Sequence, residues 1–174
     1  MGHRTARGDE EFAEFVLASS ARLTHAAYLL TSDRHHAEDA VQTVLARTYA
    51  AWKRVRHKDA YGYARRVLVN HLIDNWRRPI RELPTDDVPE VRAPDRPESL
   101  ALDRRWLAEL LDGLTGRERA VIVLRHYFDL PEADVAAELG VSLGTVKSTN
   151  SRALAKLRVA AGDEARESCG GVPR

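Results

Sequence analysis

The sequence has few of the residues on which cross-links and membrane spans depend. Its 174 residues include a single cysteine, Cys169, so no disulfide can form within the chain. That shortage favours a reducing cytosol. No apolar run approaches the ~20 residues that a membrane-spanning helix needs, and the first 20 residues lack the pattern of a signal peptide. We therefore expect a soluble, cytoplasmic protein that does not insert into a membrane.

Signatures of catalysis and of cofactor binding are also missing from the sequence. It contains no glycine-rich phosphate loop, no nucleophile–base pair and no metal cluster, so it predicts no enzyme, no catalytic residue and no cofactor. A metal-dependent hydrolase using His35, His36, Glu38 and Asp39 stays open as the weaker alternative. Adjacent histidines point about 100° apart on a helix, and no HExxH spacing is present. Acids in a first helical turn commonly complement the helix dipole, so we predict no metal site.

The distribution of charge along the chain is more informative about binding partners than the net charge, which is a formal +1 at pH 7. Residues 53–81 hold nine Lys or Arg against two acids, whereas the first 52 residues lean slightly acidic. A basic stretch of this kind can follow a phosphate backbone. Aromatic residues make up only 6%, yet Tyr61, Tyr63 and Trp76 fall within this stretch. Their rings could stack on unpaired bases or, as is more common, belong to the core.

Apolar residues recur at helical spacing along most of the chain, which predicts an all-α protein with two small helical domains. We expect helices over residues 9–30, 35–52, 60–76, 98–113, from 115 onward, and as a pair within 131–158. Residues 77–97 hold five of the seven prolines and no apolar period, which indicates an extended, flexible linker. The predicted division is a first domain at 1–78, a linker at 79–97, a second domain at 98–160 and a disordered tail at 161–174.

One face of each expected helix is apolar and should form the core. The residues expected to face inward are Phe12, Val16, Leu23, Ala26, Leu30, Ala37, Val41, Val44, Leu45, Thr48, Trp52, Ala64, Val67, Leu68, Leu72, Trp76, Leu102, Trp106, Leu110, Leu111, Val121, Leu124 and Phe128. Thr115 and Glu118 form a capping box, which predicts a clean helix start there. Residues 53–59 are expected to be a short basic connection.

Residues 131–158 have the pattern of a helix-turn-helix. Gly140 suits the left-handed end of the first helix, and Ser142 is a good N-cap for the second. Small Ala136 allows the two helices to cross closely, and Val146 would pack back onto the first. The second helix carries only basic charges between Ser142 and residue 158, so it can enter a major groove. An ordinary helical hairpin with a solvated basic face is the alternative.

Three stretches resemble regions of the sigma-70 family of bacterial RNA polymerase sigma factors, in its extracytoplasmic-function group and a SigE-like subgroup. Residues 37–52, AEDAVQTVLARTYAAW, resemble the helix that docks on the polymerase clamp. Residues 64–78, ARRVLVNHLIDNWRR, are similar to the helix that reads and opens the −10 element. Residues 114–148, LTGRERAVIVLRHYFDLPEADVAAELGVSLGTVKS, resemble the fourth region, which binds the −35 element. Pro131, Val69 and the pair Thr149-Asn150 depart from the usual pattern.

The resemblance implies a factor that binds core RNA polymerase, through its β′ clamp and β flap, and directs promoter recognition, DNA opening and transcription initiation. The implied polymerase-docking residues are Asp39, Gln42, Thr43 and Arg47. The implied −10 DNA-binding residues are Lys53, Arg54, Arg56, Lys58, Tyr61, Arg65, Arg66, Asn70, Asp74, Arg77 and Arg78. The implied −35 DNA-binding residues are Ser142, Thr145, Lys147, Ser148, Ser151, Arg152 and Lys156.

Two questions stay open at the level of sequence. Family members can have an anti-sigma factor as a further partner, and the sequence does not decide whether one exists here. The main alternative is a stand-alone helix-turn-helix transcriptional regulator that binds promoter DNA without polymerase. Such a regulator does not need the basic stretch at residues 53–81.

Overall fold

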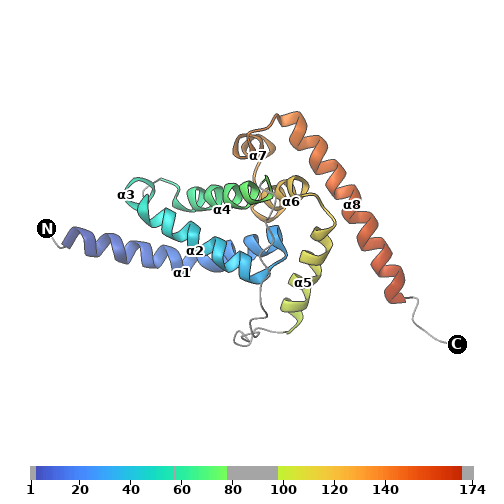
Figure 1. The fold of residues 1–174 in the computed structure, drawn as a ribbon, viewed down its shortest axis with the longest axis horizontal. Helices are drawn as coiled ribbons and strands as arrows, with labels where there is room; N and C mark the ends of the chain where they lie inside the picture. Colours follow the sequence, from blue (N-terminus) through green and yellow to red (C-terminus); the bar gives the residue numbers. More distant parts are fainter. Residues whose placement is uncertain (1–2, 57, 78–97, 170–174) are drawn as a thin grey trace.

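The computed structural model describes residues 3–56, 58–77 and 98–169, and every regular element within these ranges is a helix (Figure 1). The elements are α1 (His3–Thr31), α2 (Arg34–Ala50), α3 (Trp52–Val55), α4 (Ala60–Arg77), α5 (Glu98–Asp112), α6 (Gly116–Ile122), η1 (Val123–Tyr127), α7 (Glu132–Leu139) and α8 (Leu143–Cys169). The expected all-α class is confirmed. The predicted linker at 79–97 lies outside the described residues.

The first half of the chain is a bundle in which α1, α2 and α4 pack side by side (Figure 1). The apolar stripes of the sequence form its core, and Leu23, Val44 and Leu68 are fully buried. The turn between α1 and α2 contains an N-cap, because the Asp33 carboxylate accepts a hydrogen bond from the backbone N–H of His36 at 2.8 Å. That cap fixes where α2 begins and therefore which of its faces meets α1.

The second half contains the helix-turn-helix. Gly140 ends α7 with φ 63°, the left-handed conformation expected of it. Ser142 Oγ accepts a hydrogen bond from the backbone N–H of Thr145 at 3.1 Å and so caps α8. Val135 and Val146 are fully buried where the two helices cross. The tight corner and its cap therefore set the direction in which α8 leaves α7.

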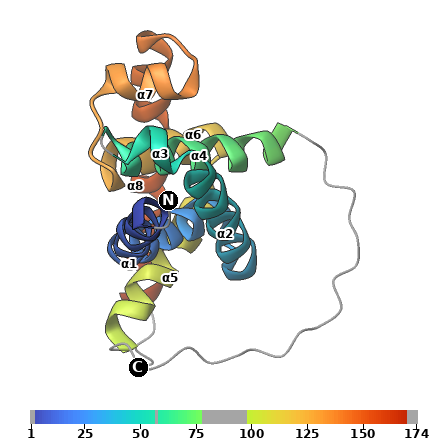
Figure 2. The same cartoon turned by 90° about the vertical axis from the view of Figure 1, so that its left-hand side faces the viewer.

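The two halves share one hydrophobic core. Leu30 and Val69 of the first half lie in the same buried cluster as Val121 and Leu124 of the second. In Figure 2, α6 lies next to α4, with α7 on one side of them and α5 beside α1 on the other. The sequence suggested two helical units joined by a tether, and it carried no sign of this direct packing.

Three other details differ from the sequence-based expectation. The expected connection at 53–59 contains α3, a turn anchored by the buried Trp52 and Val55. Trp106, expected to face inward, is 47% exposed, because α5 packs through Ala108, about 200° away on the helix. Helix α8 continues to Cys169 instead of ending near 161, where several helix-forming residues follow.

No helix in the described ranges has the length and apolarity needed to span a membrane. The side chains of two other expected core residues, Trp76 and Leu102, lie outside the described part of the chain.

Candidate functional site

The predicted polymerase-docking residues lie together on the outer face of α2. Asp39, Gln42 and Arg47 are exposed, and the half-buried Thr43 donates a hydrogen bond from Oγ1 to the Asp39 carbonyl at 3.0 Å. The opposite face of the helix is held in the core by residues such as Val44. This surface is therefore available to a partner, and it is carried by a helix whose position is fixed by packing.

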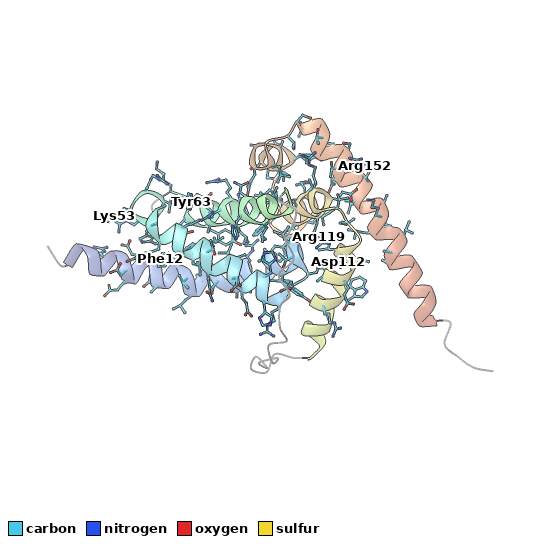
Figure 3. The ribbon with its side chains drawn as sticks, in the orientation of Figure 1. Phe12, Lys53, Tyr63, Asp112, Arg119 and Arg152 are labelled. Carbon is cyan, nitrogen blue, oxygen red and sulfur yellow. The ribbon has the colours of Figure 1, made fainter. Side chains whose placement is uncertain are left out.

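The basic corner around α3 is the next candidate surface. Lys53, Arg54 and Lys58 are exposed there, and Figure 3 shows Lys53 at the tip of this corner. Arg56 turns back instead, since its Nη1 atom forms an ion pair with Glu11 Oε2 of α1 at 2.8 Å. Of the four basic residues predicted at this corner, three present their charge outward and one braces the corner against α1.

An aromatic cluster that sequence reasoning did not identify supports this corner. The ring of Phe12 lies 4.8 Å from that of Tyr49 and 5.1 Å from that of Trp52, between ring centroids. The Tyr49 hydroxyl donates a hydrogen bond to Asp9 at 2.8 Å, and that bond raises the pKa of Tyr49. These contacts tie the start of α1 to the end of α2. The sequence shows where Phe12 and Tyr49 lie on their own helices. It does not show that their rings contact each other, because that depends on how the two helices cross.

The outer face of α4 carries Arg66 and Asn70, which are both exposed one turn apart. Asp74 and Arg77 continue the same helix at the spacing expected of a polar stripe, but their side chains lie outside the described part. Arg78 lies outside it altogether. The exposed stripe is therefore established for its first two members and stays a prediction for the rest.

Two predicted −10 residues are not free on the surface. The ring of Tyr61 lies 6.3 Å from that of Phe128, and the Arg22 guanidinium lies 5.4 Å from the Tyr61 centroid. Burial raises the pKa of Tyr61, and the neighbouring Arg22 opposes that shift. Arg65 forms an ion pair with Glu138 of α7 at 3.1 Å. Both side chains therefore engage the second half of the chain.

Helix α8 presents a polar and basic face beyond the helix-turn-helix corner. Lys147, Ser148, Ser151 and Arg152 are exposed on it, and Arg152 is labelled on this helix in Figure 3. At the start of the helix, Ser142 and Thr145 share a hydrogen bond of 2.8 Å between their hydroxyls. A helix with this face outward has the shape and charge to enter a major groove.

Lys156, the last predicted −35 residue, also has a structural role. Its Nζ atom lies 2.8 Å from Glu118 Oε2, and the Glu118 carboxylate also accepts hydrogen bonds from Thr115. The hydrogen bond with Lys156, together with those from Thr115, lowers the pKa of Glu118. The capping box of α6 and a basic residue of α8 thus form one polar cluster.

The departure at Thr149-Asn150 is accommodated by packing. Thr149 is buried, and the Asn150 side-chain oxygen lies 3.0 Å from His126 Nε2. Asn150 therefore joins α8 to η1 and does not lie on the exposed basic face.

His35 and His36 near the start of α2 are the residues on which the alternative of a metal-dependent hydrolase depends. Within the described residues, no group of three or more His, Cys, Asp or Glu side chains could hold a metal ion. Glu38 pairs instead with Arg34 one turn earlier, with Nε and Oε1 3.0 Å apart.

Comparison with known proteins identifies both halves. Residues 15–81 match the family described as Sigma-70 region 2, and residues 104–157 match Sigma-70, region 4. These ranges contain α2 and α4 on the one side and the helix-turn-helix on the other.

Relatives that match most of the chain, and solved structures of similar fold, agree with this family assignment. The chain is 43% identical to the RNA polymerase sigma-E factor of Streptomyces coelicolor, over 85% of this chain and 84% of that protein. It is 33% identical to the ECF RNA polymerase sigma factor SigL of Mycobacterium tuberculosis, over 84% and 90%. The fold is similar to sigma factor RpoE of Bartonella quintana, solved with the anti-sigma factor NepR, at TM-score 0.64 and 22% identity, covering 86% of this chain and 95% of RpoE. The chain therefore belongs to the sigma-70 family of RNA polymerase sigma factors, in the extracytoplasmic-function group.

Proposed function

We propose that this protein binds core RNA polymerase in the cytoplasm and directs it to promoters, where it supports DNA opening and transcription initiation without catalysis of its own. The observation that carries the proposal is the presence of two exposed surfaces on different halves of one chain. One is the outer face of α2, in the part that matches sigma-70 region 2, and the other is the basic face of α8, in the part that matches region 4.

The outer face of α2 is the proposed contact with the polymerase clamp. Asp39, Gln42 and Arg47 offer acceptors, donors and a charge, and their exposure means that they are not committed to the core. Polar groups that become desolvated and paired at an interface are costly to remove from one side only. A few such residues on a rigid helix can therefore contribute much of the affinity for polymerase.

The basic face of α8 is the proposed reader of the −35 element. Lys147 and Arg152 can contact phosphates or base edges in the major groove, and Ser148 and Ser151 lie between them on the same exposed face. Contacts to phosphate position the helix, and contacts to base edges supply sequence preference. We expect Lys156 to contribute little to DNA binding, because its ammonium group is already paired with Glu118.

The corner at α3 and the outer face of α4 are the proposed surface for the −10 element. Lys53, Arg54 and Lys58 can hold the backbone of an opened strand, with Arg66 and Asn70 further along α4. Flipping a base out of the duplex costs a few kcal/mol, so a preformed surface beside the melted strand lowers the net cost of opening.

One experiment separates this function from that of a stand-alone regulator. The purified full-length chain is titrated onto labelled promoter duplex, alone and together with core polymerase. We expect weak binding by the chain alone and specific binding by the complex. Tight, specific binding by the chain alone, as a symmetric dimer, would establish the stand-alone regulator instead.

The proposal includes a regulatory partner of the anti-sigma class. The solved RpoE structure contains such a factor, NepR. The test is to isolate proteins that co-purify with the full-length chain and to ask whether one of them prevents its binding to core polymerase. Failure to find a protein with that effect would remove this part of the proposal.

A further inference from the structure

The basic corner depends on α3, a helix of only one turn. A single helical turn is unstable by itself in water, because forming it fixes several backbone dihedrals for very few hydrogen bonds. Trp52 and Val55 on one side of the turn are buried, whereas Lys53 and Arg54 on the other side are exposed. The direction of the two exposed charges is therefore set by the contacts that hold the buried side.

The amino-terminal part of α1 holds the apolar side of this turn. The rings of Phe12 and Phe15 lie 5.1 and 5.2 Å from the ring of Trp52, between centroids. Beside them, the Tyr49 hydroxyl donates a hydrogen bond to the Asp9 carboxylate at 2.8 Å and so ties the end of α2 to the same part of α1. Aromatic pairs prefer particular relative orientations, so these contacts restrict the angle of the turn as well as its position.

Arg56, the residue directly after α3, adds an ionic contact with α1. Its Nη1 atom lies 2.8 Å from Glu11 Oε2, and the two side chains are 27% and 31% exposed. A Cβ atom added at Gly8 would lie 3.9 Å from the same Nη1 atom, so the guanidinium lies against the backbone of α1. Charge-assisted hydrogen bonds are about twice as strong as neutral ones. Arg56 therefore points toward α1, unlike the exposed Lys53 and Lys58 of the same corner.

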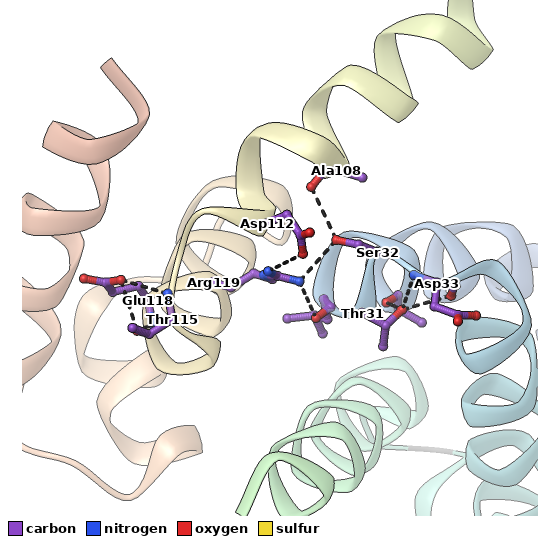
Figure 4. Close-up of polar contacts among 10 residues, drawn as sticks. Thr31, Ser32, Asp33, Ala108, Asp112, Thr115, Glu118 and Arg119 are labelled. Carbon is purple, nitrogen blue, oxygen red and sulfur yellow. Dashed lines mark hydrogen bonds and ion pairs between the residues drawn. The ribbon is translucent and has the colours of Figure 1, made fainter. Parts of the chain in front are cut away.

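Helix α1 can hold the corner because its other end is anchored. Arg119 donates hydrogen bonds from Nη1 to the Leu30 carbonyl and to Ser32 Oγ, both at 3.2 Å, and Figure 4 shows its guanidinium beside Ser32. Between the two ends of α1, Leu23 and Ala26 are fully buried in the core. A continuous helix of 29 residues with an anchored end and a buried middle is rigid, so its amino-terminal turns give the corner a fixed support.

We propose that Arg56 is a positioning residue for the −10 surface and not a DNA ligand. Through Glu11 it sets the orientation of α3, so that the exposed basic side chains of the corner meet the opened strand. Those side chains are Lys53, Arg54 and Lys58. The inference rests on the proposed −10 role of this corner. The paired charges of Arg56 and Glu11 largely cancel for a phosphate several ångströms away, so Arg56 adds little to DNA affinity directly.

The two possible roles of Arg56 differ in their response to salt. The full-length chain is bound to core polymerase on an upstream fragment that the wild-type chain opens, and permanganate reactivity of the −10 region is measured at increasing salt. Lys58→Gln should lower the slope of log affinity against log salt by about one, because a phosphate contact is lost. Arg56→Gln should reduce the reactivity at each salt concentration and keep the wild-type slope.

Glu11→Gln gives opposite results for the two roles. Loss of this carboxylate should lower the −10 reactivity as Arg56→Gln does, although the variant has one more net positive charge. If Arg56 were a DNA ligand, its release from Glu11 would raise the reactivity instead. Glu10→Gln is the matched control, since Glu10 is an exposed acid one position away on α1, and it should behave as wild type.

A charge exchange separates positioning from a direct DNA contact. Glu11→Arg and Arg56→Glu should each lower the reactivity, and the double variant should recover most of it, because the ion pair forms again with its partners exchanged. A contact between Arg56 and phosphate could not be restored in this way, since a carboxylate at position 56 repels phosphate. Melting temperatures show whether each variant is folded at the assay temperature, and co-elution with core polymerase shows whether docking through α2 is intact.

Three results would overturn the proposal. A slope lowered by about one in Arg56→Gln, or a higher reactivity in Glu11→Gln, would make Arg56 a DNA ligand. A folded double exchange with no more reactivity than either single variant would show that the pair does not position the corner. A wild-type slope in Lys58→Gln would remove the corner itself from the −10 surface. None of these results affects docking through α2, whereas a wild-type complex with no more reactivity than core polymerase alone would contradict the proposed function itself.

Discussion

Arg65 on α4 and Glu138 on α7 form a two-pronged ion pair across 73 residues of sequence, with oxygen–nitrogen distances of 3.3 and 3.1 Å. Arg65 belongs to the stretch predicted to bind DNA, and Glu138 belongs to the first helix of the helix-turn-helix. The guanidinium of Arg65 is thus paired within the chain, and a contact with the phosphate of a promoter strand, as proposed for the −10 surface, requires that this pair be exchanged or shared.

The double variant Asp39→Ala, Gln42→Ala should lose affinity for core polymerase and keep its fold. Both residues are exposed, and exposed substitutions usually change stability by no more than about 0.5 kcal/mol. Loss of polar contacts in a desolvated interface costs more, about 1–3 kcal/mol each. Melting curves and a binding titration with core polymerase measure the two effects separately. Wild-type affinity for polymerase in a folded double variant would mean that the docking face is misplaced.

Lys147→Ala and Arg152→Ala should each weaken binding to −35 duplex. A residue that contacts phosphate should also reduce the slope of log affinity against log salt by about one. Arg158→Ala is the matched control, since Arg158 is exposed on the same helix but lies further from the corner. Salt titrations in which all three variants resemble wild type would remove Lys147 and Arg152 from the interface.

Asn70→Ala should impair promoter opening more than it impairs binding to polymerase. Its side chain is exposed on α4, on the face proposed to meet the melted strand. Permanganate reactivity of thymines in the −10 region reports opening, and co-elution with core polymerase reports binding. Normal permanganate reactivity in this variant would mean that the exposed stripe on α4 is a solvated helix face with no role in promoter opening.

Gly140 and Gly144 should respond in opposite directions to substitution by alanine. Gly140 has φ 63°, so an alanine there is strained by about 1–2 kcal/mol although nothing lies within 4 Å of its Cβ. Gly144 lies in the first turn of α8, where its backbone is not left-handed and its Cβ would meet only an ordinary contact, so alanine should stabilise the protein by about 0.4–1 kcal/mol. Chemical denaturation measures both. Equal effects of the two substitutions would contradict the left-handed corner.

Glu118→Gln should destabilise the protein at neutral pH and lose that effect in acid. The bonds from Lys156 and Thr115 lower the pKa of Glu118, so the folded state favours the carboxylate. Its contribution is present above the unfolded-state pKa, near 4.3, and disappears as the pH falls through the folded-state pKa. Thermal melts of wild type and variant should therefore differ most near pH 7 and converge in acid. A difference that is constant across that range would contradict the assignment.

The local features of the fold were predictable because short-range chemistry determines them. The caps at Asp33, Thr115 and Ser142 and the left-handed Gly140 each depend on residues within one turn of helix. The apolar stripes likewise identified most buried residues by their helical spacing. The position of Trp106 was wrong because spacing shows that a helix has an apolar side, but not which part of that side meets its neighbour.

The arrangement of the two halves was not predictable from a single sequence. The contacts of Arg119 with Leu30 and of Arg65 with Glu138 join residues 89 and 73 positions apart. Nothing in the sequence around one residue of a pair indicates which residue is its partner. The composition of the chain favoured two domains that do not pack together, because a proline-rich linker is typical of independent domains. The site residues divide similarly: exposed ones such as Asp39 and Arg152 lie as helical spacing implied, whereas Tyr61 and Lys156 have partners that only the fold reveals.

Run-off transcription with purified core RNA polymerase tests the central claim most directly. The templates are upstream fragments from the source genome, and the reactions contain core polymerase alone, with the wild-type chain, or with the Asp39→Ala, Gln42→Ala variant. The account predicts discrete transcripts with the wild-type chain, none with core polymerase alone, and few with the variant. Transcripts that are the same with and without the chain would contradict the claim that this protein directs promoter-specific initiation.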